Sequence, residues 1–172
     1  MSAAIIGAAL RLREATDADF ARIADIYAHH VRTGFGTFDE VPPSREDMVE
    51  RFHAIAQLGL PYLVMAEGEA VLAYAYAAPY RPRSAYRFTV EDSIYVAPDS
   101  HRRGLGTNLL NRLAERCAAA GMRQMVAVIG DSANLASINL HAKCGFRPIG
   151  VLNDVGYKGE RWLDAVIMQR TL

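Results

Sequence analysis

The sequence lacks several features that mark other classes of protein. Only Cys117 and Cys144 are cysteines, and they form no CxxC or zinc-binding pattern. This argues against a disulfide framework and suits a reducing, cytoplasmic location. The longest uncharged apolar stretch, residues 70–80, falls well short of the ~20 residues that a membrane-spanning helix needs. Residues 1–9 are small and mostly apolar but lack the basic start of a signal peptide.

An excess of charge is also absent. The chain has 19 Lys and Arg against 19 Asp and Glu, so its formal net charge is zero. A neutral chain has no overall field that attracts nucleic acid or anionic lipid, and we expect neither nucleic acid nor membrane as a partner. The 172 residues, 51% hydrophobic and 22% charged, are ordinary for a globular protein. We therefore expect one domain over residues 1–172, with residues 1–9 as an N-terminal extension.

Hydrophobic periodicity and turn residues divide the chain into strands and helices. Alternating or continuous apolar runs predict strands, and apolar spacings of three and four predict helices. The predicted strands are residues 10–14, 62–66, 71–80, 86–96, 125–129, 146–152 and 162–169. The predicted helices run from a Thr16–Asp19 capping box to about Arg32, from Ser44 to a stop at Gly59 and Pro61, over 104–120 and over 134–143. This order predicts an α/β fold, layered in the α+β manner around a mixed sheet.

A glycine-containing segment between a predicted strand and a predicted helix is the sharpest local signal. Residues 100–107 read SHRRGLGT. Small residues let backbone N–H groups approach a phosphate, and the helix N-terminus adds partial positive charge. His101, Arg102 and Arg103 add cations. The segment lacks the GK[ST] of a P-loop and the full G-x-G-x-x-G of a Rossmann turn. By itself it fits a polyphosphate site and a glycine turn with solvated arginines equally well.

Two neighbouring segments give this loop a context. The strand before it reads TVEDSIYV at 89–96, and a later helix reads NLASINLHAKCGF at 134–146. Together they resemble the GNAT acetyltransferase superfamily, whose loop follows [QR]-x-x-G-x-[GA] and whose later helix follows N-x-x-A/S…[YH]-x-x-x-GF. The element order also matches, so the resemblance covers nearly the whole chain. It implies the GNAT fold, with a mostly antiparallel sheet of about seven strands flanked by four helices. It also implies acetyl-coenzyme A as acetyl donor.

Further segments are similar to one group of that family, the phosphinothricin and methionine sulfoximine N-acetyltransferases. These segments are Phe38, APYRPR at 78–83, YR at 86–87, TVE at 89–91 and GERWLD at 159–164. Three positions depart from the pattern of the family or group. His101 replaces Gln or Arg, Asp92 replaces His, and Ala73 replaces Gly. The Asp92 difference alters the floor of the acceptor pocket, so it bears on the acceptor's identity rather than on the reaction.

The resemblance implies catalytic roles for two residues. An amine must lose a proton before it attacks a thioester, and Glu91 is the candidate base. We expect Glu91 in a partly apolar cleft among Tyr80, Tyr86 and Phe88, which would raise its pKa. An exposed residue or an arginine partner is the alternative. His141 matches the position of a general-acid tyrosine in many members, and imidazole titrates near neutrality. A purely structural histidine fits equally well.

The resemblance also implies contacts with the two substrates. We expect cofactor contacts from Ile94, Tyr95, Val96, Arg102, Arg103, Gly104, Leu105, Gly106, Thr107, Asn134 and Ser137. Backbone N–H groups of the 94–96 strand would stabilise the oxyanion. We expect acceptor contacts from Phe38, Arg81, Arg83, Glu91, Asp92 and Ser93. A guanidinium pair suits bidentate capture of an anionic group, although solvated loop arginines are commoner. Gly34 and Gly36 would let the Phe38 loop move.

The predicted function is acetyl-coenzyme A-dependent N-acetylation of a small amino-acid-like amine of the phosphinothricin or methionine sulfoximine type. One alternative is acetylation of a protein N-terminus or lysine, which would need a longer open groove. Another is a non-catalytic acyl-coenzyme A sensor, which the presence of both Glu91 and His141 disfavours. The histidines at 29, 30 and 53 form no ligand set with a nearby Asp or Cys, so we predict no metal. The resemblance suggests a homodimer.

Overall fold

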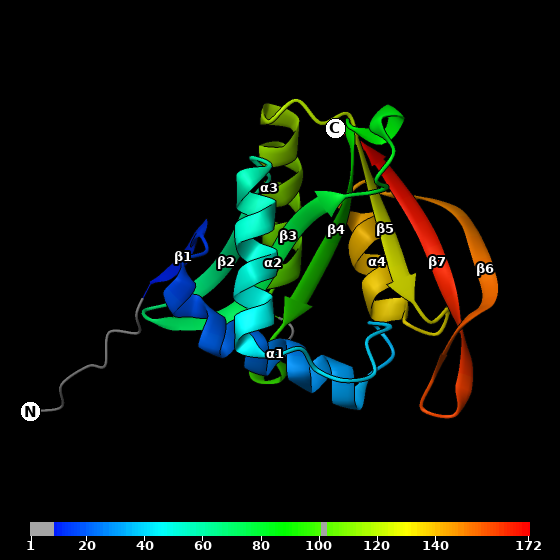
Figure 1. Cartoon of the computed structure of the whole chain (residues 1–172), viewed down its shortest axis with the longest axis horizontal. Coiled ribbons are helices and arrows are strands. Elements are labelled where there is room, and N and C mark those ends of the chain that lie inside the picture. The colour runs from blue at the N-terminus through cyan, green and yellow to red at the C-terminus, as the bar shows by residue number, and fades with distance from the viewer. Residues whose placement is uncertain (1–8, 101–102) are drawn as a thin grey trace, which may run out of the picture.

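A twisted sheet forms the centre of the molecule (Figure 1). The computed structural model describes residues 9–100 and 103–172. The sheet has seven strands in the order β1-β2-β3-β4-β5-β7-β6, and every neighbouring pair is antiparallel except β4 and β5. The strands are β1 Leu10–Glu14, β2 Tyr62–Glu67, β3 Ala70–Pro79, β4 Thr89–Val96, β5 Gln124–Gly130, β6 Arg147–Lys158 and β7 Arg161–Thr171. The expected fold class is confirmed.

Two pairs of helices pack on the sheet. They are α1 Phe20–Thr33, α2 Arg45–Gln57, α3 Leu105–Ala119 and α4 Leu135–Lys143. Helices α1 and α2 contact each other, as do α3 and α4 (Figure 1). The apolar stripes predicted for α1 and α3 are buried, because each faces the strands. None of the helices in the described residues is both long enough and apolar enough to span a membrane.

Three predicted boundaries differ from the structure by three or more residues. Strand β4 begins at Thr89 instead of residue 86, because Ser84–Tyr86 form a 3₁₀ turn closed by local backbone hydrogen bonds. The aromatic residues of that turn mimic strand composition. Strand β6 continues to Lys158 instead of residue 152, and its two register shifts against β7 blur the alternation in its sequence. A 3₁₀ turn at Asp17–Asp19 precedes α1.

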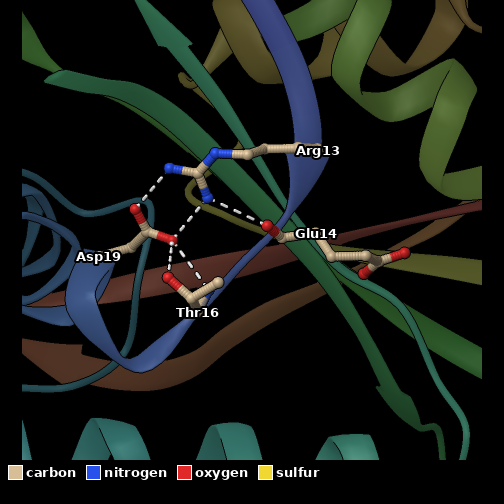
Figure 2. Close-up of polar contacts among 4 residues, drawn as sticks. All are labelled: Arg13, Glu14, Thr16 and Asp19. Carbon is tan, nitrogen blue, oxygen red and sulfur yellow. Dashed lines mark hydrogen bonds and ion pairs between the residues drawn. The ribbon is translucent and has the colours of Figure 1, made fainter. Parts of the chain in front are cut away.

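A buried carboxylate fixes the passage from β1 to α1 (Figure 2). Asp19 accepts hydrogen bonds from both terminal nitrogens of Arg13, at 2.7 and 2.8 Å, and from the Thr16 backbone N–H at 2.8 Å. Burial alone would raise the pKa of Asp19, but the hydrogen bonds from Arg13 and Thr16 outweigh it and hold that pKa below its usual value. The predicted capping residues therefore also join the first strand to the first helix.

The sheet opens at its middle. The parallel pairing of β4 with β5 covers only residues 89–91 against 124–126. Beyond that point β4 stays paired with β3 as far as Val96, and β5 stays paired with β7 as far as Gly130. The two halves of the sheet therefore diverge at the carboxyl ends of β4 and β5. This opening positions the candidate site.

Candidate active site

Two adjoining cavities occupy the opening between β4 and β5. The larger, here called the large cleft, has a volume of about 680 Å³. The smaller, here called the small cavity, has a volume of about 220 Å³. Gly36, Ile94, Tyr95 and Ser137 line both. A molecule that fills the large cleft can therefore present a reactive end to a second molecule in the small cavity.

Most of the predicted cofactor residues come together in the large cleft. Its lining includes Ile94, Tyr95, Val96, Gly104, Leu105, Gly106, Thr107, Asn134 and Ser137. Arg103 is outside the lining and forms an exposed ion pair with Glu67 at 2.8 Å. Arg102 lies outside the described residues, as does His101, which differs from the family pattern.

The first turn of α3 has the backbone that an anion requires. Gly104 is the N-cap residue of α3. Its φ of +72° is a left-handed backbone conformation that residues other than glycine rarely adopt. The first N–H groups of a helix have no partner within it, and the helix dipole adds partial positive charge there. A Cβ on Gly106 would lie 3.1 Å from Leu140 Cδ2, so this glycine also allows α3 to approach α4. These features fit a polyphosphate.

Sequence reasoning missed one wall of the large cleft. Gly34 and Phe35 line it from the loop between α1 and α2, and Asp131 and Arg161 line it from the ends of β5 and β7. Arg161 forms an ion pair with Asp131 at 2.7 Å, and its guanidinium lies 4.5 Å from the centre of the Phe35 ring. Gly34 and Gly36 were the sequence features that could have indicated this wall, but they were interpreted only as allowing the loop to move.

Polar side chains dominate the small cavity. Of the predicted acceptor residues, Phe38, Glu91, Asp92 and Ser93 line it. Tyr27, Thr37 and Tyr76 also line it and were not predicted. The predicted Arg81 and Arg83 are exposed and lie outside the lining. Arg81 packs over the Tyr80 ring at 4.6 Å, and its charge still acts on Glu91.

Glu91 is partly buried in the small cavity. Burial raises the pKa of Glu91, the negative charge of Asp92 raises it further, and the charge of Arg81 opposes this shift. The expectation that Tyr80, Tyr86 and Phe88 surround Glu91 is wrong, because none of them lines the small cavity. Tyr86 and Phe88 are 42% and 44% exposed and outside the lining. The 3₁₀ turn carries Tyr86 away from the strand and delays the start of β4 beyond Phe88.

His141 and Asp92 form a buried pair at the floor of the small cavity. His141 Nε2 lies 3.0 Å from Asp92 Oδ2, with side-chain exposures of 3% and 1%. His141 Nδ1 lies 2.8 Å from the Ser137 carbonyl oxygen, which can only accept, so Nδ1 donates. Burial lowers the pKa of His141, but the hydrogen bond and charge of Asp92 outweigh burial and raise it overall. Asp92 Oδ1 is also buried, and it has no hydrogen-bond partner among the described residues.

The remaining histidines make individual contacts. His30 Nε2 lies 2.9 Å from the Val96 carbonyl oxygen and lines the large cleft. His53 Nε2 lies 2.8 Å from Asp17 Oδ1 in an exposed pair. In the part of the chain that the structure describes, no three His, Cys, Asp or Glu side chains gather into a possible metal site.

A family model described as the acetyltransferase (GNAT) family matches residues 16–146. The chain belongs to this family. It is 52% identical over 164 residues to a phosphinothricin N-acetyltransferase of Alcaligenes faecalis, covering 95% of this chain and 83% of that protein. It is 41% identical over 163 residues to an L-methionine sulfoximine/L-methionine sulfone acetyltransferase of Pseudomonas paraeruginosa, covering 94% of each.

Solved structures agree with this assignment. A phosphinothricin acetyltransferase of Sinorhizobium meliloti, in complex with acetyl-coenzyme A, has a TM-score of 0.91 at 46% identity, covering 95% of this chain and 88% of that one. A ribosomal-protein-alanine N-acetyltransferase of Brucella melitensis has a TM-score of 0.91 at 33% identity, covering 94% and 99%.

Proposed function

We propose that the chain transfers the acetyl group of acetyl-coenzyme A to the amine of a small amino-acid-like acceptor of the phosphinothricin or methionine sulfoximine type. One observation carries this proposal. A partly buried carboxylate, Glu91, lines a small cavity that shares Gly36, Ile94, Tyr95 and Ser137 with a cleft built for a polyphosphate. The names of the relatives at 52% and 41% identity support the acceptor class.

The large cleft fits the acetyl donor. The backbone N–H groups at the start of α3, residues 104–107, can bind an anion without a cationic side chain. Asn134 and Ser137, in the first turn of α4, line the same cleft. Because β4 separates from β5 after residue 91, the backbone groups of residues 94–96 have no hydrogen-bond partner on β5. When bound, acetyl-coenzyme A supplies the acetyl group as an activated thioester.

Glu91 is the proposed general base. Its raised pKa makes the carboxylate a better proton acceptor than an exposed glutamate. The proton moves from the acceptor ammonium to Glu91, directly or through water, and frees the amine lone pair for attack. We propose that backbone N–H groups of residues 94–96 stabilise the charge that develops on the carbonyl oxygen.

His141 is the second catalytic candidate, as proton donor to the leaving sulfur. It lines the small cavity, and its Nε2 lies within hydrogen-bonding distance of Asp92 Oδ2. Both ring nitrogens are engaged, so donation requires a proton to leave a buried pair. The same contacts support the alternative, in which His141 and Asp92 fix α4 against β4. Variants at Asp92 separate these two roles.

Arg81 and Arg83 are the proposed partners of the acceptor's anionic group. They follow β3 and precede β4, beside the small cavity, and the charge of Arg81 is felt at Glu91. Because both are exposed, they would act from the rim on an acid group that extends out of the cavity. Phe38, at the cavity wall and 38% exposed, would cover the acceptor.

Acetylation of a protein N-terminus is the second candidate. The 33% identity to a ribosomal-protein-alanine N-acetyltransferase favours it. The small volume of the acceptor cavity, about 220 Å³, favours a free amino acid instead. A non-catalytic sensor would need the large cleft but would have no use for Glu91 in the adjoining small cavity.

We also propose a homodimer, a cytoplasmic location and a single domain. The edge strand β6 and the start of β7 expose large apolar side chains at 46–61%, namely Ile149, Val151, Leu152, Val155, Tyr157 and Trp162. A surface of this kind suits a second subunit. The two cysteines are free and buried, which suits a reducing compartment. The one sheet runs through the described residues.

Glu91→Gln tests the proposed base, because it keeps the side chain's shape and removes the proton acceptor. Turnover should fall by ~10²–10⁴ while the affinity for coenzyme A stays the same. Steady-state kinetics with an amino-acid acceptor and calorimetry with coenzyme A measure the two effects. Near-normal turnover of the variant at neutral pH would move the base elsewhere.

A further inference from the structure

One buried cation has no part in the proposed chemistry. Lys158, at the end of β6, is 6% exposed, and it is one of only two lysines in a chain with 17 arginines. Its ammonium donates to two backbone carbonyl oxygens, those of Gly34 and Thr37, each at 2.9 Å. Burying a charge is costly unless hydrogen bonds compensate. The hydrogen bonds to these two carbonyl oxygens therefore compensate for the burial of the Lys158 charge.

The two carbonyls bracket a short stretch of the loop between α1 and α2, here called the 34–38 segment. Gly34, Phe35 and Gly36 line the large cleft, and Gly36, Thr37 and Phe38 line the small cavity. One stretch of backbone thus forms part of the wall of both substrate sites. In Figure 1 this loop runs beneath the ends of β5 and α4, on the side where the β6–β7 hairpin extends.

Two glycines hold the 34–38 segment at close range from the sheet. A Cβ on Gly130 would lie 2.2 Å from the Phe35 carbonyl oxygen. A Cβ on Gly156 would lie 2.3 Å from the Phe38 ring. Real side chains do not tolerate such distances, so the packing depends on glycine at both positions. The 34–38 segment is therefore packed closely against β5 and β6.

The ammonium suits this place better than a guanidinium does. A lysine presents a compact charge with three donors, whereas arginine presents a larger planar fork. Two carbonyls that belong to one bend of backbone require donors diverging from a single atom. Asp39 and Glu40, which follow the segment, add favourable charge at longer range.

We propose that Lys158 is a positioning residue for the acceptor site, which fixes the 34–38 segment so that Thr37 and Phe38 form a wall of the small cavity. This inference rests on the proposed function for its kinetic readout. It predicts that losing the ammonium loosens the acceptor wall more than the large cleft, because the cleft keeps its walls from β4, α3 and α4.

Lys158→Met tests the proposal, since methionine fills similar space without donors. The acceptor KM should rise by about tenfold, which corresponds to ~1.4 kcal/mol of lost acceptor binding. The KM for acetyl-coenzyme A should change by less than about threefold. Lys158→Arg should recover only part of the loss. Lys143→Met, at the other lysine, is exposed at the end of α4 and should match the wild type.

Two further measurements keep the proposal open to refutation if Lys158→Met folds poorly or the acceptor is misassigned. Gly156→Ala pushes on Phe38 without touching Lys158 and should also raise the acceptor KM selectively. Hydrogen exchange of amides 34–38 should accelerate in folded Lys158→Met whether or not an acceptor is known. An acceptor KM within about twofold of wild type, or unchanged exchange at 34–38, would overturn the proposal. Wild type that acetylates no amino acid would instead refute the proposed function.

Discussion

The Asp92–His141 pair makes a quantitative prediction about stability. Asp92→Ala removes one member of a pair whose side chains are 1% and 3% exposed and whose atoms lie 3.0 Å apart. Removing one partner of such a pair costs ~3–5 kcal/mol, and we expect the lower end because His141 can lose its proton. At ~2–4 °C per kcal/mol for a chain of this length, Tm should fall by about 6–12 °C. Asp92→Asn should cost about 1 kcal/mol, since its amide can still donate to Nε2.

The pH dependence gives this prediction its sign. The pKa of His141 is raised in the folded protein, so its contribution to stability is fully present below the unfolded pKa of ~6.5. That contribution is lost as pH rises through the folded pKa. The difference in unfolding free energy between wild type and Asp92→Asn should therefore be largest near pH 6 and shrink at higher pH.

Urea unfolding of both variants between about pH 5.5 and 9.5 measures this difference. Asp99→Ala is the matched control, because Asp99 is 71% exposed and its pair with Arg22, at 3.5 Å, should contribute at most about 1 kcal/mol. A difference that does not vary with pH, or an Asp92→Ala cost below about 1 kcal/mol, would refute the reasoning. If folded Asp92→Asn loses turnover while its acceptor KM is unchanged, His141 acts as the acid. If turnover survives, the pair is structural.

Three other changes have defined outcomes. Gly104→Val forces a β-branched residue to φ +72°, so calorimetry should show at least a tenfold loss of coenzyme A affinity, and an unchanged affinity would contradict the large cleft as cofactor site. Arg81→Ala or Arg83→Ala should raise the KM of a carboxylate-bearing acceptor by about two- to fivefold, as expected for an exposed ion pair, while its decarboxylated amine is unaffected, and equal effects on both acceptors would exclude an anion contact. Asp19→Asn should lower Tm at pH 7, and its difference from wild type should vanish as acid protonates Asp19 below its lowered pKa, whereas a gap that persists at low pH would point to packing rather than charge.

Local sequence patterns were sufficient for most of the fold. The helices follow from apolar spacing and from caps such as Ser44, whose hydroxyl accepts from the Asp47 N–H. The long extent of β6 could not be predicted, because an edge strand with exposed side chains on both faces shows no alternation. The turn at Ser84–Tyr86 was missed because aromatic residues suggest strand wherever they occur.

The candidate site was predictable where contacts are close in sequence. The Gly104–Thr107 loop and the Glu91–Ser93 strand each line the expected cavity. The Asp92–His141 pair spans 49 residues, and the contact of Lys158 with Thr37 spans 121. Such contacts depend on how β4 parts from β5 and on how the β6–β7 hairpin meets the loop after α1. Neither arrangement has a local sequence pattern.

The central claim is that this chain acetylates the amine of a small amino-acid-like acceptor. The most direct measurement is release of free thiol from acetyl-coenzyme A in the presence of phosphinothricin, methionine sulfoximine or a short peptide that begins with alanine, each with wild type and Glu91→Gln. The account predicts rapid release with at least one of the amino-acid analogues, little with the peptide, and a loss of ~10²–10⁴ in the variant. Preferred release with the peptide, or equal release by both proteins, would contradict it.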